Sequence, residues 1–322
     1  MTVKHALRAP MSIGAGLLLF LVAMPAADKA GDEPRVTIEP RVKAVKTSDL
    51  SVDSSLVLIP VSVTDSKSHP VVGLDAHKFR VFEGKAEQQV LHVSADDAPV
   101  SVGIVFDASA SMTSKLPKAR EAVKEFLKTA NPADEFCLVN FATKAELSVP
   151  FTSSAPDIQN RLMFADSKGK TALLDAVYLA LDAMKGAANP RKALLIISDG
   201  GENDSRYTET EIKSIVRETG VWIYAIGIYS HNLMLPEEER GGPKLLDDLA
   251  EASGGRQFAV HNADDLPAAA AKIGLELRNQ YLLGYRPAKV EHDGKYHKVQ
   301  VKLVESGGLL LSWRPGYYAP GW

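Results

Sequence analysis

The stretch Val102-Gly-Ile-Val-Phe-Asp-Ala-Ser-Ala-Ser-Met112 decides the fold. Its first five residues are mostly apolar and run directly into Asp107, with no alternation of apolar and polar side chains. Such a run is typical of a strand that is buried on both faces, as in a parallel sheet. Parallel sheets carry ligands in the loops at the carboxyl ends of their strands. Asp107, Ser109 and Ser111 therefore lie where chemistry is expected, and they offer the oxygen ligands that hard divalent cations prefer.

Downstream of this strand, apolar strands alternate with segments of helical periodicity. Strands are expected at 136–141, 193–198, 221–228 and 258–260, and helices at 115–129, 157–164, 172–184, 209–219, 244–252 and 263–279. Strands that alternate with helices of this length imply right-handed crossovers and a sheet covered by helices on both faces. The sequence therefore predicts an α/β fold over residues 97–280, with a doubly wound, mostly parallel sheet.

Two groups of strands flank the α/β region, one within residues 51–96 and the other within residues 281–322. Their expected strands lie at 56–64, 79–82, 89–93, 281–285, 298–304 and 309–313. The second and third of these are expected to form a hairpin. Neither group has enough apolar surface to form a core alone. We therefore expect the two groups to pack together into one small β-sandwich.

The N-terminus has the layout of a secretory signal peptide. Basic residues precede an apolar core over residues 11–23, and two alanines follow at 26–27. The apolar core is short for a membrane span. We therefore expect a cleaved signal peptide over residues 1–27 and a polar linker over 28–50, with an uncleaved N-terminal anchor as the alternative. The protein is then exported to the periplasm, the cell surface or the medium, with no membrane span after cleavage.

The composition limits the classes of protein to consider. The chain has 322 residues, enough for one full domain and a smaller one. Its formal net charge of −3 gives no support to nucleic-acid binding, which is typical of strongly basic domains. The single cysteine, Cys137, lies in an apolar strand, so it is expected to be a small buried side chain with no disulfide.

Side chains that offer oxygen ligands lie in three loops at the ends of expected strands. Besides the loop that begins at Asp107, one loop carries Thr171 and another begins at Asp199. A single Ser, Thr or Asp at such a place is more often a helix cap than a ligand. Three such loops in this order instead indicate a common site.

The pattern Asp107-x-Ser109-x-Ser111, then Thr171, then Asp199-Gly200 resembles the metal-ion-dependent adhesion site (MIDAS) of the von Willebrand factor type A domain. The resemblance covers about residues 97–280. The flanking stretches are similar to a group of bacterial secreted proteins with a type A-related domain, at 61–65, 79–83, 96–100, 281–285 and 314–320.

This resemblance implies a role for each matching residue. The hydroxyl oxygens of Ser109, Ser111 and Thr171 are expected to bind the ion directly. Asp107 and Asp199 are expected to hold it through water or as hydrogen-bond acceptors around it. The expected ion is Mg²⁺, with Mn²⁺ and Ca²⁺ as alternatives.

The chemistry of such a site predicts its partner. Mg²⁺ takes about six oxygen ligands and keeps some of its water. Neutral hydroxyl ligands leave the charge of the ion under-compensated, so its open position should attract an acidic side chain of another protein. Gly200, Tyr207 and His231 are expected to line the rim that this partner contacts, and the long connection 229–243 is expected to lie on the same rim. The sequence leaves the oligomeric state open.

Enzyme motifs are incomplete in this chain. A phosphoaspartyl enzyme needs a second Asp where Ser109 stands, and a phosphate-binding P-loop needs Gly where Phe164 stands. A calcium EF-hand that begins at Asp107 needs Gly at Met112 and Glu at Lys118. We therefore expect an adhesion-type binding module rather than an enzyme. The alternatives are a structural envelope module whose metal only stabilises the rim loops, and a metal-dependent hydrolase.

Overall fold

The computed structural model of the protein describes residues 56–95, 97–229, 240–289 and 291–321. These residues all belong to one compact unit, Asp53–Trp322. The expected signal peptide and linker, together with His231, lie outside the described residues. Among the residues described, none of the helices has the length and apolarity that crossing a membrane requires.

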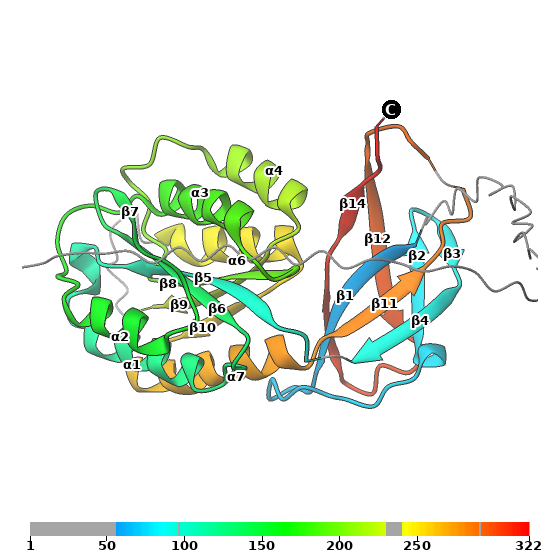
Figure 1. Ribbon diagram of the computed structural model, residues 1–322, viewed down its shortest axis with the longest axis horizontal. Helices are drawn as coiled ribbons and strands as arrows, with labels where there is room; N and C mark the ends of the chain where they lie inside the picture. The colour runs from blue at the N-terminus through cyan, green and yellow to red at the C-terminus, as the bar shows by residue number, and fades with distance from the viewer. Residues whose placement is uncertain (1–55, 96, 230–239, 290, 322) are drawn as a thin grey trace, which may run out of the picture. The chain divides into compact units, whose positions relative to one another are not determined.

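A six-stranded sheet forms the centre of the α/β region (Figure 1). Its order is β10-β9-β8-β5-β6-β7, with β5 at Val100–Asp107, β6 at Glu135–Phe141, β7 at Ala145–Thr152, β8 at Arg191–Ser198, β9 at Trp222–Ile228 and β10 at Gln257–Val260. Neighbouring strands are parallel, except that β7 is antiparallel to β6. All eight residues of β5 are buried. The predicted doubly wound, mostly parallel sheet is thus confirmed.

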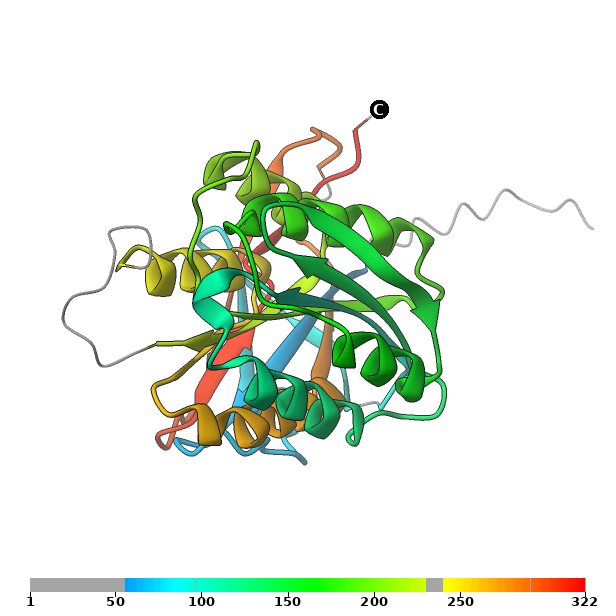
Figure 2. The same cartoon turned by 90° about the vertical axis from the view of Figure 1, so that its left-hand side faces the viewer.

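Helices cover both faces of this sheet, as the end-on view in Figure 2 shows. They are α1 (Leu116–Leu127), α2 (Ala155–Met163), α3 (Leu173–Ala183), α4 (Glu209–Thr219), α6 (Gly242–Ser253) and α7 (Leu266–Arg278), with 3₁₀ turns at Ala76–Lys78, Ala110–Met112, Met184–Gly186 and Ala263–Asp265. One apolar core joins the sheet to α1, α2 and α7, and a second joins its other face to α3, α4 and α6. Cys137 on β6 is fully buried, as predicted.

Local sequence explains the ends of these helices, and α4 is the clearest case. The hydroxyl of Thr208 accepts a hydrogen bond from the backbone N–H of Glu211, whose side chain accepts one from the backbone of Thr208. This reciprocal capping box satisfies two backbone donors that the first helical turn leaves without partners. Gly220 ends the helix in the left-handed conformation, with φ of 67°.

The flanking segments form two further sheets, both antiparallel (Figure 1). Their orders are β13-β1-β11-β4 and β14-β12-β2-β3, with β1 at Val57–Thr64, β2 at Phe79–Glu83, β3 at Ala86–Gln88, β4 at Val90–Ala95, β11 at Tyr281–Tyr285, β12 at Tyr296–Leu303, β13 at Leu310–Trp313 and β14 at Gly316–Tyr318. Strands from both ends of the chain share one apolar core. This is the β-sandwich that the sequence predicts.

The expected hairpin between 79–82 and 89–93 is wrong. β2 pairs instead with the short strand β3, and β4 crosses to the other sheet, where it pairs with β11. Gly84 turns the chain between β2 and β3 with φ of 57°. The apolar pattern of β4 was correctly interpreted as a strand, but its partner β11 belongs to the other flanking segment, beyond the whole α/β region.

Candidate metal centre

Two acidic residues emerge side by side from neighbouring strands. In the parallel pair of β5 and β8, Phe106 lies opposite Ile197, so the next residues, Asp107 and Ser198, reach the same edge. Asp107 is 0% exposed, and Asp199, one residue beyond Ser198, is 2% exposed. The hydroxyl of Ser198 donates to Oδ2 of Asp107 at 2.5 Å. The carboxyl ends of the two central strands therefore hold two buried carboxyl groups.

The turn after β5 presents two hydroxyl groups beside Asp107. The backbone N–H of Ser109 donates to Oδ1 of Asp107 at 2.8 Å, which folds the chain back over the strand end. The hydroxyl oxygens of Ser109 and Ser111 lie 3.1 Å apart. Ser109 begins the 3₁₀ turn Ala110–Met112, yet its side chain makes no capping hydrogen bond. Its hydroxyl is therefore not used as a helix cap.

Thr171 reaches the same edge from the loop before α3. Its backbone N–H donates to Oδ1 of Asn203 at 2.9 Å, and its carbonyl accepts from the N–H of Asn203. A Cβ atom placed on Gly201 would stand 3.4 Å from Oδ1 of Asp199 and 3.5 Å from Oγ1 of Thr171. These two oxygen atoms therefore face the same small space. Ala172, not Thr171, is the residue that precedes α3, and no side chain caps that helix.

Hydrogen bonds fasten the loop that carries Thr171 to the turn after β5. The N–H of Lys168 donates to the carbonyl of Ala108 at 2.9 Å, and the N–H of Ala110 donates to the carbonyl of Gly169 at 3.1 Å. The hydroxyl of Ser167 donates to the carbonyl of Ser109. The structure thus brings the loops of Asp107, Thr171 and Asp199 together.

Two buried carboxyl groups and one ammonium group determine the charge at this edge of the sheet. Burial and the nearby charge of Asp199 raise the pKa of Asp107 to about 7, although hydrogen bonds from Ser109 and Ser198 oppose the shift. The ammonium group of Lys115 lies 2.8 Å from Oδ2 of Asp199, and the Lys115 side chain is only 16% exposed. The two buried carboxyl groups thus already attract one cation from the chain itself.

The donor set fits a small hard cation. Three hydroxyls and two carboxyl groups are all oxygen ligands, the kind that Mg²⁺ and its relatives prefer. The ammonium of Lys115 stands in for such a cation, because it neutralises a carboxylate that is almost fully buried. The sequence analysis missed Lys115, which it gave only as the first residue of the expected helix at 115–129.

The family comparison agrees with this geometry. Residues 102–202, which include all five candidate ligands, match the family model of the von Willebrand factor type A domain. The chain contains a von Willebrand factor type A domain.

The similar proteins match this chain over only part of their own length. A UPF0353 protein of Mycolicibacterium paratuberculosis is 28% identical over 57% of this chain and 61% of its own. Among solved structures, a type A protein from Catenulispora acidiphila has a TM-score of 0.49 and 13% identity over 80% of this chain and 71% of its own. Proximal thread matrix protein 1 from the mussel byssus, with a zinc-occupied MIDAS motif, has a TM-score of 0.46 and 21% identity over 61% of this chain and 49% of its own. The chain spans 35% to 61% of the length of the curated relatives it matches.

Gly200 and Tyr207, two of the residues expected to line the rim of the type A domain, pack against its helices α6 and α3. Gly200 is buried, with φ of 80°, and a Cβ there would lie 2.6 Å from the backbone of Gly242 in α6. The ring of Tyr207 stacks on that of Tyr178 in α3, with centroids 4.2 Å apart. His231 lies outside the described residues. The structure therefore gives Gly200 a packing role close to Asp199.

An open cleft of about 540 Å³ adjoins the metal-site loops of the type A domain. Its lining residues include Thr143, Asp175, Asp204 and Arg206. The hydroxyl of Thr143 accepts from the N–H of Lys170, and the N–H of Asp204 donates to the carbonyl of Thr171. The cleft is thus hydrogen-bonded to the loop that presents Thr171.

Proposed function

We propose that the type A domain binds a divalent cation at this edge and, through that ion, a carboxylate of a partner protein. The observation that carries this proposal is the convergence of five oxygen side chains from three loops. Neither the hydroxyl of Ser109 nor that of Thr171 caps a helix in the structure. Ser109 and Thr171 are both buried, and buried polar side chains that do not cap a helix are typical of a ligand site.

Each residue has a defined part in this proposal. The hydroxyls of Ser109, Ser111 and Thr171 would hold the ion directly, while Asp107 and Asp199 would accept hydrogen bonds from its water. The bound ion would supply a strong positive charge at the surface. The ion is proposed to be Mg²⁺, with Mn²⁺ and Ca²⁺ as alternatives that share the same oxygen preference.

The proposed partner is an acidic side chain because the protein ligands that touch the ion are neutral. A partner carboxylate would complete the coordination and balance the remaining charge. The adjoining cleft, with Arg206 and Lys144 in its lining, offers cationic groups to the same acidic partner. We propose that this binding takes place outside the cytoplasm, as the expected signal peptide over residues 1–27 implies.

Titration calorimetry with Mg²⁺, Mn²⁺ and Ca²⁺ tests the metal site. We expect one ion to bind at the type A domain of the wild type, with at least tenfold weaker binding by Thr171→Ala and Ser109→Ala. Ser153→Ala is a matched control, because Ser153 is exposed and lies outside the site. Equal binding by all four proteins would contradict the proposal.

A pull-down from a cell-envelope fraction tests the partner. We expect a bound protein that is released by a chelator and is not captured by Thr171→Ala. A chelator that lowers the melting temperature by several degrees without releasing any partner would instead support the structural module. Hydrolysis of phosphate or carboxyl esters that disappears in Ser109→Ala would support the hydrolase.

A further inference from the structure

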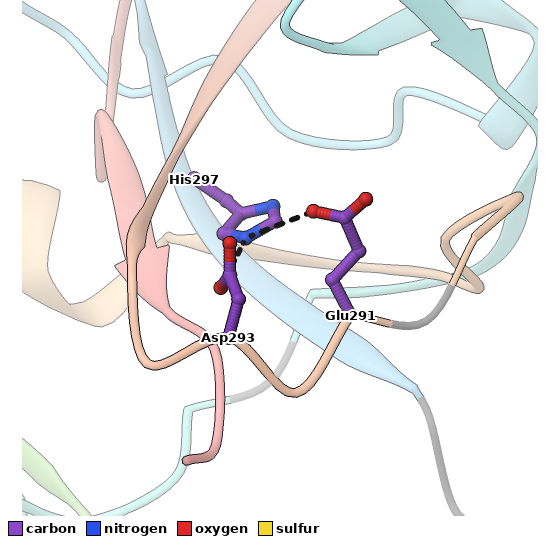
Figure 3. Close-up of side chains that lie close together, drawn as sticks. All are labelled: Glu291, Asp293 and His297. Carbon is purple, nitrogen blue, oxygen red and sulfur yellow. Dashed lines mark hydrogen bonds and ion pairs between the residues drawn. The ribbon is translucent and has the colours of Figure 1, made fainter.

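Three metal-ligating side chains meet in the β-sandwich, outside the type A domain (Figure 3). Glu291 and Asp293 lie in the connection between β11 and β12, and His297 is the second residue of β12. Nε2 of His297 lies 3.2 Å from Oδ1 of Asp293 and 3.9 Å from Oε2 of Glu291. One ligand atom from each residue lies within 4.8 Å of the other two.

Glu83 on β2 orients the imidazole of His297 from the opposite side. Its Oε1 lies 2.9 Å from Nδ1 of His297, and its Oε2 accepts a hydrogen bond from the hydroxyl of Tyr285 at 2.9 Å. Both Glu83 and His297 are mostly buried, with side chains 13% and 14% exposed. Because Glu83 accepts at Nδ1, the other ring nitrogen is directed at Glu291 and Asp293. A carboxylate that holds the far nitrogen is the usual companion of a metal-binding histidine.

Two lysines engage the oxygens of the acidic residues that do not contact His297. The ammonium of Lys289 lies 2.6 Å from Oε1 of Glu291, and that of Lys295 lies 3.8 Å from Oδ2 of Asp293. The other two oxygens, Oε2 of Glu291 and Oδ1 of Asp293, contact the imidazole, and Oδ1 of Asp293 also accepts from the backbone N–H of Lys295 at 2.9 Å. The cluster therefore presents one nitrogen and two carboxylate oxygens to a common point.

The separations suit an ion at that point. Zn²⁺ lies about 2.0–2.2 Å from imidazole nitrogen and carboxylate oxygen, so its tetrahedral ligands are roughly 3.4 Å apart. The distances from Nε2 of His297 to Oδ1 of Asp293 and Oε2 of Glu291, 3.2 and 3.9 Å, lie on either side of this value. Asp293 and His297 also line an open cleft of about 410 Å³, which leaves room for water at a fourth position.

We propose that Glu291, Asp293 and His297 form a site for a divalent transition-metal ion, with Zn²⁺ as the ion that their chemistry suits best. Glu83 is its positioning residue, because it holds the imidazole without touching the ion. The ion ties the connection after β11 to β12 and, through Glu83, to β2. This site shares no residue with the one proposed in the type A domain, so either proposal can fail without the other.

Zn²⁺ binding to the full chain tests this site, measured by competition with a chromogenic chelator. The Ser109→Ala/Thr171→Ala double variant removes the type A site from the measurement. Excess Mg²⁺, which should occupy the type A site of the wild type, serves the same purpose without mutation. In each of these two samples, we expect one Zn²⁺ per chain. We expect His297→Ala in the double variant to weaken Zn²⁺ binding at least tenfold, while His77→Ala, at an exposed histidine, leaves it unchanged.

Conservative variants keep the test valid if His297→Ala fails to fold. Asp293→Asn and Glu291→Gln should each weaken Zn²⁺ binding, and Glu83→Gln should do so by about 10–100-fold without removing a ligand. Circular dichroism checks the fold of each variant. Stoichiometric Zn²⁺ binding that none of these changes affects, or no Zn²⁺ binding by the double variant, would overturn the proposal and leave a network of ion pairs.

Discussion

Lys115 is the side chain that we expect to compete most directly with a cation at the proposed metal site. Its ammonium group neutralises Asp199, which is almost completely withdrawn from solvent. A divalent ion that binds beside Asp199 must therefore compete with a cation that the chain supplies itself. The resemblance of the sequence to the adhesion-site motif predicts five oxygen ligands, but not this contact. Nothing in the apolar periodicity of α1 distinguishes Lys115 from the exposed lysines that follow it.

Lys115→Met should bind Mg²⁺ more tightly than the wild type, by roughly tenfold, because it removes a positive charge beside the ion. Without metal, the same variant leaves Asp199 without its cation and should melt at a lower temperature. Calorimetry and thermal unfolding in chelator measure the two effects. Lys118→Met is the matched control, since Lys118 pairs with Glu121 and Asp264 at the surface. Equal affinities in Lys115→Met and the wild type would contradict this role.

The loops and helices around the site are held by close packing that a sequence pattern does not reveal. Gly200 was expected to contact a partner, whereas the structure places it against the first turn of α6. Strand β7 was not predicted, because its residues are half-buried or exposed at the edge of the sheet and Pro150 interrupts them. The ends of the buried strands β5, β8 and β9 were predicted to within two residues, since their apolar runs favour a buried strand.

Gly200→Ala should destabilise the protein by about 1–3 kcal/mol, because Gly200 has a positive φ and meets the backbone of Gly242, which cannot move aside. Gly186→Ala provides the contrast, since no atom lies within 4 Å of the added methyl group and φ is not positive. Urea unfolding measures both variants. A loss of stability in Gly186→Ala equal to that in Gly200→Ala would contradict the packing argument.

Asp248 joins α4 to α6 through ion pairs with Lys213 and Lys244, at 2.9 and 2.8 Å. Hydrogen bonds from these two lysines hold the pKa of Asp248 below its usual value. A lowered carboxyl pKa stabilises the fold above the unfolded pKa, near 3.9, and this contribution is lost as the pH falls below it. Asp248→Asn should therefore lose at most about 1 kcal/mol at neutral pH, and progressively less below about pH 4. Urea unfolding of the two proteins at pH 7 and pH 3 gives the comparison, and an undiminished difference at pH 3 would contradict it.

The two flanking segments together form one structure with a shared core. β1 pairs with β11 on one side and β13 on the other, so both of its neighbouring strands come from the C-terminal segment. The sequence predicts this partnership from the shortage of apolar surface in each segment. It does not predict which strands pair, because the register depends on residues that are distant in the chain.

A chain that ends at residue 280 should keep the type A domain folded but lose the sandwich. Removal of β11 to β14 leaves β1 with no strand partner in its sheet. We expect limited proteolysis to cut within 56–95 in this shortened protein and to spare that region in the full chain. Persistent protection of residues 56–95 after the truncation would contradict the shared core.

The hydroxyl of Tyr281 donates to the carbonyl of Val71, 210 residues earlier in the chain. On the ribosome or during translocation, the first strands therefore emerge long before the segments that cover them. The type A domain has its own core and is able to form in that interval. Until the last strands arrive, β1 presents open edges that other chains are able to join. The yield of folded protein in the cell should consequently depend on a chaperone that holds the unpaired strands, more strongly than the stability of the folded protein suggests.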